Sequence, residues 1–363
     1  MIYLIGYPAD VGGANTEIWH TIKLWRRFGA EVSVVPTWSA TLKWERRLAA
    51  IGVPTLPSRN GKFSAIPDDS ICVSFCNPLF ARHSATLANR GCRLIYAPCM
   101  SYWSNAERKR LENTGPFDRY VFQSQSQDDL LYPLLEQHGV PWENCQRIPG
   151  AFDTEEFPFR YRARPSAKDP FVVGRLCRPD PAKFAQNTWD LFGQVRRQVP
   201  GLQVRIMGWS NKVAAKIGKP PPWAEVREKN TMPVADFLGG LHCMIAANDR
   251  DPANSAATEN WPRVGLEAMS AGVPIVADCR GGWPEMIDHL QTGCLAATDQ
   301  ELVENVSLLA ANESWRAEIV RVARHDLATR LADPQPIWAA WRQLFKELES
   351  DHPTAAESTT PMA

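Results

Sequence analysis

The sequence predicts an α/β fold of two doubly wound domains that face a central cleft. Short apolar runs typical of buried strands alternate with segments of helical spacing, and the alternation restarts in the second half of the chain. At 363 residues the chain is longer than one hydrophobic core usually supports, so about two domains are expected. Ligands of such domains bind outside the carboxyl ends of the strands, and two facing domains therefore share one cleft.

The first domain is expected over residues 1–160. It opens with a strand at Ile2–Ile5, a glycine-containing loop, a helix over Asn15–Phe28 and a strand at Glu31–Val35. In such a unit the N-terminus of the helix is suited to a phosphate. Gly12-Gly13 stand without the Gly-x-Gly-x-x-Gly pattern, which disfavours a nicotinamide-dependent dehydrogenase. Further elements are expected at Ile71–Phe75, Leu79–Asn89, Arg93–Ala97, Tyr120–Gln123 and Asp128–His138.

The segment Arg160–Lys168 is basic, contains proline and has no periodicity, as expected of a linker. The second domain is expected over residues 169–335. Its strands are expected at Phe171–Val173, Gln203–Met207, Leu241–Ala246 and Pro274–Ala277, and two of its helices at Gln300–Ala311 and Ser314–Leu331. A last helix is expected over residues 336–349, and the tail of Pro, Ser, Thr and Ala over residues 350–363 is expected to be disordered.

Composition excludes several classes of protein. Forty basic and forty acidic side chains cancel, so no bulk charge favours nucleic acid. No apolar run approaches the ~20 residues that span a bilayer, and the N-terminus lacks the basic flank of a secretory signal. Nine cysteines without a Cys-x-x-Cys pair are typical of buried reduced thiols. We therefore expect a cytoplasmic protein.

Two glutamates, Glu259 and Glu267, stand eight positions apart across a junction between a loop and a helix. Pro262 suits the first turn of that helix, and Gly272 ends it. Glu259 is thus expected in the loop and Glu267 just over one turn inside the helix. Both carboxylates can face the same space at the helix N-terminus, where backbone N–H groups favour an anion.

A single pair of glutamates would also fit an ordinary amphipathic helix with two solvated acids. Here the stretch from Glu259 to Asp278, ENWPRVGLEAMSAGVPIVAD, is followed from Arg280 to Leu295 by RGGWPEMIDHLQTGCL. The joint pattern resembles the retaining glycosyltransferases of the GT-B fold, family-four type, also called group 1. The resemblance implies two Rossmann-like domains, a C-terminal helix that crosses back to the first domain, and a nucleotide-sugar donor as substrate without a cofactor.

The resemblance also implies roles for particular residues. The first glutamate of the family, here Glu259, holds the donor sugar, and the second, here Glu267, binds the ribose hydroxyls. A departing diphosphate requires fixed cations, and Arg175 and Lys183 fit that role after a strand, with Arg178 able to share one contact. The remaining expected donor-binding residues are Gly12, Gly13, Gly174, Trp209, Met232, Gly281 and Gly282. Trp209 could equally stack on the base or fill the core of the domain.

Two positions depart from the family pattern. The family usually has glycine where Pro262 stands, and proline lacks the backbone N–H that can reach the donor. Many relatives have a histidine after the strand that corresponds to Arg93–Ala97, whereas this chain has Pro98-Cys99-Met100. A catalytic histidine is therefore not carried over to this sequence.

Two further patterns are weaker. Asp249-Arg250-Asp251 spells the acidic pair that binds a divalent cation in other glycosyltransferases, but the resembled family does not use it, so no metal site is expected. The basic and aromatic segment from Lys43 to Arg47 could meet an anionic acceptor or a membrane surface, although a solvated helix face explains it more simply.

The sequence as a whole predicts a retaining, metal-independent glycosyltransferase. Its donor is expected to be a UDP-, GDP- or ADP-linked sugar, and its acceptor, whether glycan, lipid-linked or small molecule, is not identified. One alternative is transfer to a nucleic acid base, which the neutral charge disfavours. Another is a catalytically inactive binding protein of the same fold, suggested by Pro262 and the missing histidine.

Overall fold

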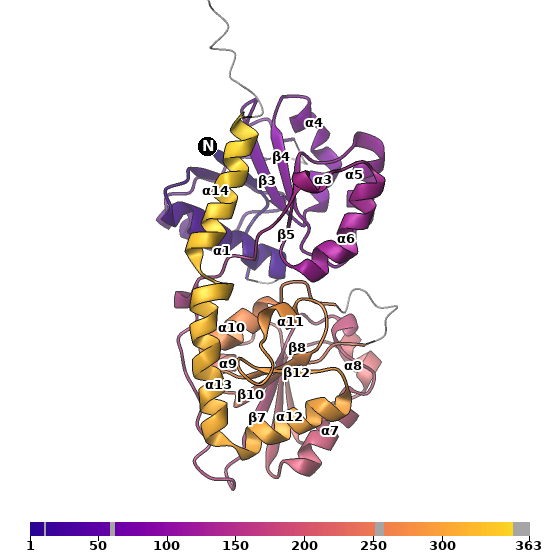
Figure 1. Ribbon diagram of the computed structural model, residues 1–363, viewed down its shortest axis with the longest axis vertical. Helices are drawn as coiled ribbons and strands as arrows, with labels where there is room; N and C mark the ends of the chain where they lie inside the picture. The colour runs from indigo at the N-terminus through magenta and orange to yellow at the C-terminus, as the bar shows by residue number, and fades with distance from the viewer. Residues whose placement is uncertain (11, 59–61, 251–257, 351–363) are drawn as a thin grey trace, which may run out of the picture.

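The computed structural model describes residues 1–10, 12–58, 62–250 and 258–350. It contains two α/β domains, one above the other in Figure 1, and each is built on a parallel sheet of six strands. The expected fold class is thereby confirmed. Of the tail expected to be disordered over residues 350–363, Ser350 belongs to the last helix and residues 351–363 lie outside the described residues.

The first sheet has the strand order β2-β1-β3-β4-β5-β6. The strands and helices of this domain are β1 (Ile2–Ile5), α1 (Gly13–Arg27), β2 (Val32–Val35), α2 (Leu42–Ala50), β3 (Ile71–Phe75), α3 (Pro78–His83), α4 (Ala85–Ala88), β4 (Arg93–Ala97), α5 (Asn105–Thr114), β5 (Arg119–Phe122), α6 (Gln125–Gln137) and β6 (Cys145–Arg147). The chain reverses its direction of winding between β1 and β3. Their carboxyl ends therefore flank a crevice suited to a ligand.

Helix α1 begins directly after Gly12, whose φ of 98° is one that glycine adopts at little cost. Ile18, Ile22 and Trp25 form its buried stripe on the sheet. The single helix expected over Leu79–Asn89 is instead two short helices, α3 and α4, which meet at Ser84. The buried hydroxyl of Ser84 accepts a hydrogen bond of 2.8 Å from Nε of Arg110, which fixes this junction against α5.

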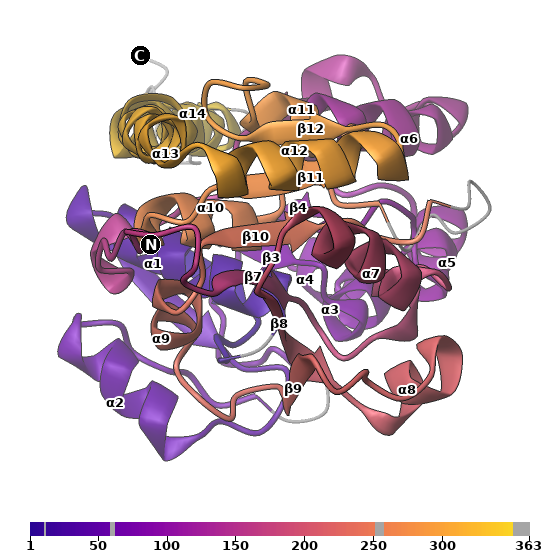
Figure 2. The same cartoon turned by 90° about the horizontal axis from the view of Figure 1, so that it is seen from below.

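The second sheet has the order β12-β11-β10-β7-β8-β9, the order of a Rossmann domain read from its far edge. Its strands are β7 (Phe171–Leu176), β8 (Leu202–Trp209), β9 (Ala224–Glu228), β10 (Cys243–Ala246), β11 (Ile275–Asp278) and β12 (Cys294–Ala296). Its helices are α7 (Thr188–Gln198), α8 (Asn211–Ile217), α9 (Val234–Gly239), α10 (Arg263–Ala271), α11 (Trp283–Met286), α12 (Asp299–Ala311) and α13 (Glu313–Asp326). Figure 2 shows α9 and α10 on one side of this sheet and α7 and α8 on the other.

The segment from Arg160 to Lys168 has neither helix nor strand, as expected of a linker. It is nevertheless held firmly against the second domain. The guanidinium of Arg164 donates hydrogen bonds to the carbonyls of Ala167 (2.7 Å), Asp169 (2.9 Å) and Ala310 (3.2 Å). The linker is thus packed as part of the second domain.

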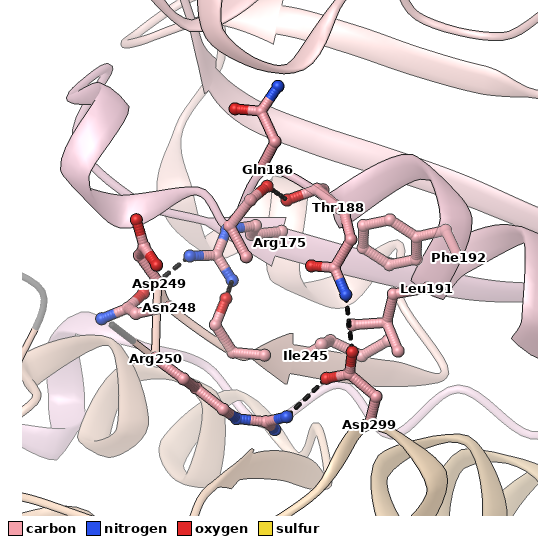
Figure 3. Close-up of a pocket in the computed structure, with 13 residues that line it drawn as sticks. Arg175, Gln186, Thr188, Leu191, Phe192, Ile245, Asn248, Asp249, Arg250 and Asp299 are labelled. Atoms are coloured by element: carbon pink, nitrogen blue, oxygen red, sulfur yellow. Dashed lines mark hydrogen bonds and ion pairs between the residues drawn. The ribbon is translucent and has the colours of Figure 1, made fainter. Parts of the chain in front are cut away.

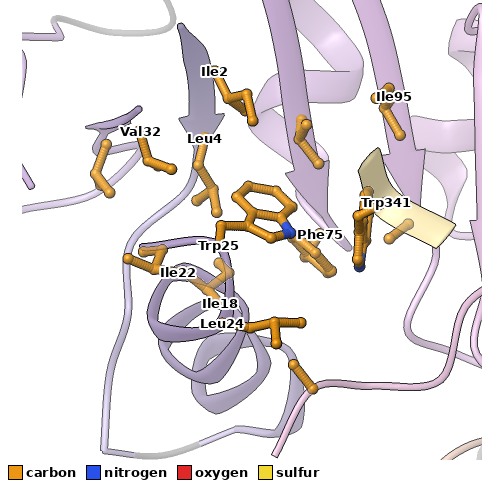
Figure 4. Close-up of a cluster of buried hydrophobic side chains, with 14 of the residues drawn as sticks. Ile2, Leu4, Ile18, Ile22, Leu24, Trp25, Val32, Phe75, Ile95 and Trp341 are labelled. Carbon is orange, nitrogen blue, oxygen red and sulfur yellow. The ribbon is translucent and has the colours of Figure 1, made fainter. Parts of the chain in front are cut away.

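The last helix, α14 (Pro334–Ser350), runs along the first domain in Figure 1. Its apolar side chains complete the core between α1 and the first sheet, as Figure 4 shows for Trp341 beside Trp25 and Phe75. The rings of Trp25 and Trp341 meet edge to face, with centroids 5.1 Å apart. The chain therefore begins and ends its described structure in the same domain.

Candidate active site

A cleft of about 420 Å³ lies between the two domains, at the carboxyl ends of their strands. From the first domain it is lined by the glycine loop before α1 and by the ends of β3 and β4. From the second domain it is lined by the loops after β7 and β9 and by the first turns of α10. Both sheets thus present their switch points to one space, as expected of facing doubly wound domains.

Glu259 lies at the wall of this cleft and is joined to a lysine and an amide. Oε1 of Glu259 accepts hydrogen bonds from Nζ of Lys183 at 2.9 Å and from Nδ2 of Asn248 at 3.1 Å. Burial raises the pKa of Glu259, but the charge and hydrogen bond of Lys183, together with Asn248, outweigh that effect and lower the pKa below its ordinary value. Glu259 is therefore an ionised acceptor.

The loop that carries Glu259 is fixed by the glycine pair Gly281-Gly282. The backbone N–H of Gly282 donates to the carbonyl of Glu259 at 2.8 Å. A Cβ atom on Gly282 would lie 1.6 Å from the carbonyl oxygen of Asn260, and one on Gly281 would lie 2.3 Å from that of Glu259. These two glycines, expected at the donor, instead lie behind the Glu259 loop and allow its close approach.

Arg175 is buried, and Figure 3 shows it among the residues that line a second cavity. Its guanidinium donates to the carbonyl oxygen of Ala247 at 2.5 Å, to Oδ1 of Asn248 at 2.7 Å and to the carbonyl oxygen of Lys183. It faces a second cavity of about 490 Å³ rather than the cleft. Arg175 does not line the cleft, and its expected direct contact with a diphosphate stays a prediction. Arg175 instead holds both partners of Glu259.

Among the residues that the structure describes, the cations that line the cleft are Lys183, Arg178, Lys229 and Arg263, all on the second domain. Lys183 is joined there by Arg178, which is exposed, and by Lys229 after β9. The sequence analysis identified Lys183 and Arg178 as candidate donor-binding cations but missed Lys229. Its position directly after a strand was the available signal, but β9 is a short, polar edge strand that the apolar pattern does not reveal.

Glu267 lines the cleft from α10, whose N-cap is Pro262. Pro262 therefore stands just before the helix rather than at its first residue. The pKa of Glu267 is raised, first by burial and further by the nearby charge of Glu156, while the charge of Arg263 opposes the shift. The two motif glutamates thus share one cleft but titrate in opposite directions from the ordinary value.

The family comparison bears directly on this domain. Residues 167–312 match the model of the family described as glycosyl transferases group 1. The matched residues correspond to the second domain and its linker. A GDP-mannose-dependent alpha-(1-6)-phosphatidylinositol monomannoside mannosyltransferase of Mycobacterium tuberculosis is 26% identical, over 53% of this chain and 56% of that protein. The match therefore spans about half the length of this curated relative.

Solved structures are similar over nearly the whole chain. The UDP complex of Anabaena Alr3699/HepE has a TM-score of 0.71 at 17% identity, covering 95% of this chain and 99% of that one. TarM has a TM-score of 0.75 at 11% identity, covering 95% and 98%. At such identities the likeness concerns the fold, and it shows the GT-B arrangement of the two domains.

Besides Arg175 and the glycine pair Gly281-Gly282, three further residues expected at the donor do not line the cleft. A Cβ atom on Gly174 would lie 2.2 Å from Cδ1 of Leu241, so Gly174 is a packing glycine within β7. Trp209 packs beside Trp189, with ring centroids 5.7 Å apart, and so fills the edge of the core. Met232 packs on the other core cluster, while its neighbours Asn230 and Val234 line the cleft.

Gly12 and Gly13 do line the cleft, at the N-terminus of α1, where they were expected. The strand end that lacks a histidine also lines it, through Cys99 and Met100, together with Cys76 after β3. Burial raises the pKa of the Cys76 thiol to about 11 and that of Cys99 well above its ordinary value. These thiols are therefore protonated near neutral pH, and they do not replace the missing histidine as a base.

The acidic pair considered for a metal is engaged by cations where the structure describes it. Asp249 accepts from Nζ of Lys216 at 2.8 Å, and Arg250 binds Asp278 at 2.8 Å. Asp251 lies outside the described residues. Within the described ranges, no group of three His, Cys, Asp or Glu side chains is placed to hold a metal ion. The helices in those ranges include none that is long and apolar enough to cross a membrane.

Proposed function

We propose that this chain is a retaining, metal-independent glycosyltransferase that moves a sugar from a nucleotide-sugar donor to an acceptor hydroxyl. The observation that carries the proposal is the Lys183–Glu259 pair at the mouth of a switch point, with Glu267 and the glycine loop on the same cleft. The relatives support a nucleotide-sugar donor. The mycobacterial relative is GDP-mannose-dependent, and HepE structures hold UDP and UDP-glucose.

The leaving group explains why the cations gather on one wall. When the bond between sugar and diphosphate breaks, negative charge builds up on the phosphate oxygens. Lys183, Arg178 and Lys229 line the cleft on the domain that would hold the nucleotide. Fixed cations at that place stabilise the departing diphosphate more than the intact donor, and this difference accelerates transfer.

The two glutamates bind the two parts of the donor other than the diphosphate, which are the ribose and the sugar. Glu267 accepts hydrogen bonds from the ribose hydroxyls, while Glu259 accepts them from hydroxyls of the sugar to be transferred. Gly12 and Gly13 bring the N-terminus of α1 close to the diphosphate from the opposite domain. Arg175 acts through others, because its hydrogen bonds fix the Lys183 backbone and the Asn248 amide.

The placement of the groups supports the proposal that configuration is retained. Inversion requires a general base opposite the leaving group, and at the usual histidine position the cleft is lined by Cys99 and Met100. We propose that the acceptor oxygen attacks the anomeric carbon on the face from which the diphosphate departs. The C–O bond to phosphate breaks, the new C–O bond forms, and a phosphate oxygen takes the acceptor proton.

A panel of nucleoside diphosphates and their sugars tests the donor assignment by thermal shift. A ligand at 100 times its Kd adds about 2.7 kcal/mol of stability, which is readily measured. UDP, GDP and ADP with their sugars are compared, with the monophosphates as controls. Stabilisation by one nucleoside diphosphate supports the donor site, and the absence of any shift contradicts it.

Two further measurements test the mechanism. Chelation with EDTA should leave the rate unchanged, because side-chain cations already neutralise the diphosphate. Loss of activity with rescue by Mn²⁺ or Mg²⁺ would contradict metal independence. Proton NMR of the first product should show an α anomer from an α-linked donor, and a β anomer would contradict retention. Salt-dependent binding of DNA or RNA would favour transfer to a nucleic acid base instead.

We also propose a cytoplasmic location. All nine cysteines are free thiols in the structure, as is typical of proteins in a reducing compartment. Subcellular fractionation tests this directly, and recovery of the protein in an oxidised, disulfide-bonded form would contradict it.

A further inference from the structure

An ion pair joins the two domains beside the cleft, between Arg263 and Glu17. Arg263 is the first residue of α10 and is only 8% exposed. Its Nη1 donates to Oε2 of Glu17 on α1 and, at 2.9 Å, to the carbonyl oxygen of Ala151. The guanidinium of Arg263, on the second domain, therefore donates to two oxygen atoms of the first domain.

The carboxylate of Glu17 also accepts hydrogen bonds from residues of its own domain. It is 2% exposed, and its Oε1 accepts from the backbone N–H of Ala151 at 2.8 Å and from the hydroxyl of Thr21 at 3.1 Å. Those bonds orient the carboxylate but leave its charge to be balanced. A buried carboxylate without a cation is costly, so the position of Arg263 matters for more than one hydrogen bond.

The two domains approach closely beside this ion pair. A Cβ atom on Gly150 would lie 2.5 Å from Oε2 of Glu17 and 2.8 Å from the ring of Trp261. Gly150 thus lies against both Glu17 of the first domain and Trp261 of the second. Such contact fixes the approach of the domains, because even one added methyl group would force them apart.

The pair also links two parts of the cleft. Glu17 lies one turn into α1, whose N-terminus carries Gly12 and Gly13, and Arg263 lies one turn before Glu267 on α10. All five residues line the same cleft. The ion pair therefore links the glycine loop before α1 to the first turn of α10. Breaking it would leave two buried charges without partners.

We propose that Glu17 and Arg263 form a strut that holds the two domains in the donor-binding arrangement, so that Arg263 is a positioning residue for the donor site. This inference rests on the proposed function only where it concerns the donor. The strut itself is a property of the unliganded chain, and it can be measured without any substrate.

The test compares the full chain with Glu17→Gln, Arg263→Gln and the double variant. Glu17→Gln keeps an oxygen for the Ala151 N–H and removes the charge, and Arg263→Lys keeps the charge. Small-angle X-ray scattering of the unliganded proteins reports the separation of the domains, and calorimetry with UDP and GDP reports affinity. Arg321→Gln removes an exposed ion pair with Glu318 on α13 and serves as the matched control.

Each single variant should increase the radius of gyration and weaken binding of the preferred nucleoside diphosphate by about tenfold, as expected for partners that share one contact. The double variant should be no worse than either single variant, Arg263→Lys should recover part of the loss, and the control should match the wild type. An unchanged radius of gyration in folded Glu17→Gln and Arg263→Gln would overturn the strut. Loss of folding in both would also overturn it, since the pair would then be part of the fold itself.

If neither UDP nor GDP binds the wild type while the scattering changes as expected, the strut stands and the nucleotide-sugar assignment fails. If nucleotide binds and the scattering does not change, the donor assignment stands and the strut fails. The two proposals are thus separated by one set of variants.

Discussion

Nζ of Lys183 lies 2.9 Å from Oε1 of Glu259, on the second domain's wall of the cleft. The lysine is 6% exposed at its side chain and the glutamate 28%, so the pair is open to a ligand on the glutamate side. Arg175 holds this arrangement from behind through the Lys183 carbonyl and Asn248. Contacts within the protein thus hold the cation and the carboxylate in place, which lowers the cost of ordering them around a donor.

Lys183→Met should lower the turnover number by roughly 10²–10³-fold, in line with other fixed donors to a developing anion. The apolar chain is retained, so the fold should persist while the phosphate charge is left unbalanced. Initial rates of nucleoside diphosphate release measure the effect. Lys346→Met, on the exposed side of α14, should keep the wild-type rate. Wild-type turnover in Lys183→Met would mean that Arg178 or Lys229 stabilises the departing diphosphate instead.

Arg175→Met should reduce stability, because three oxygens lose a donor in the interior. A buried acceptor left unsatisfied costs about 1–3 kcal/mol, so the free energy of unfolding should fall by about 3 kcal/mol or more. Urea denaturation followed by circular dichroism measures this. Arg178→Met removes an exposed guanidinium and should stay within about 0.5 kcal/mol of the wild type. Equal stability of the two variants would contradict the structural role of Arg175.

Gly282→Ala should impair sugar transfer more than nucleotide binding. Its methyl group would meet the Asn260 carbonyl oxygen at 1.6 Å, so the Glu259 loop must move while α10 and Glu267 remain in place. We expect a lower turnover number with a nearly unchanged Kd for the nucleoside diphosphate. Gly193→Ala, in α7, should change neither, because the added Cβ atom would make only an ordinary contact, 3.9 Å from Nη1 of Arg197. Wild-type turnover in Gly282→Ala would show that the loop position is not critical.

Glu267→Gln should weaken binding of the nucleoside diphosphate by about 1.5–3 kcal/mol, the range of a hydrogen bond to a charged group. The raised pKa of Glu267 sets the pH dependence. Only the ionised form accepts from both ribose hydroxyls, so affinity should be full above the raised pKa and fall as the pH drops through it. Calorimetry from about pH 8 to about pH 5 should show this fall above the ordinary glutamate range. The same fall in Glu267→Gln would assign it to another group.

Much of the fold could be predicted because buried parallel strands are short apolar runs. Ile2–Ile5, Ile71–Phe75 and Arg93–Ala97 have the bounds expected from the sequence. The strand β9 was missed, because it is a half-exposed edge strand of mixed polarity. Helix α10 was placed correctly to within a residue at its start, since Pro262 and Gly272 mark its ends.

The site was predictable where motif spacing decides position and not where tertiary contacts decide orientation. Glu259, Glu267 and Lys183 were expected at the cleft from their motif spacing, and all three line it. The side chain of Arg175 turns to carbonyls of Ala247 and Lys183, which no local pattern reveals. Arg263 and Glu17 are 246 positions apart in the sequence, so their contact follows only from the meeting of the two domains.

The release of nucleoside diphosphate from a nucleotide sugar tests the proposed activity most directly. The wild type and Lys183→Met are each incubated with UDP-, GDP- and ADP-linked sugars, with and without a sugar acceptor, and the free diphosphate is quantified over time. We predict that the wild type releases the diphosphate from one class of donor, and that Lys183→Met binds the same donor but releases it at least about 10²-fold more slowly. A wild type that binds nucleoside diphosphate yet releases none from any of these donors would contradict the proposed transferase and leave a binding protein of the same fold.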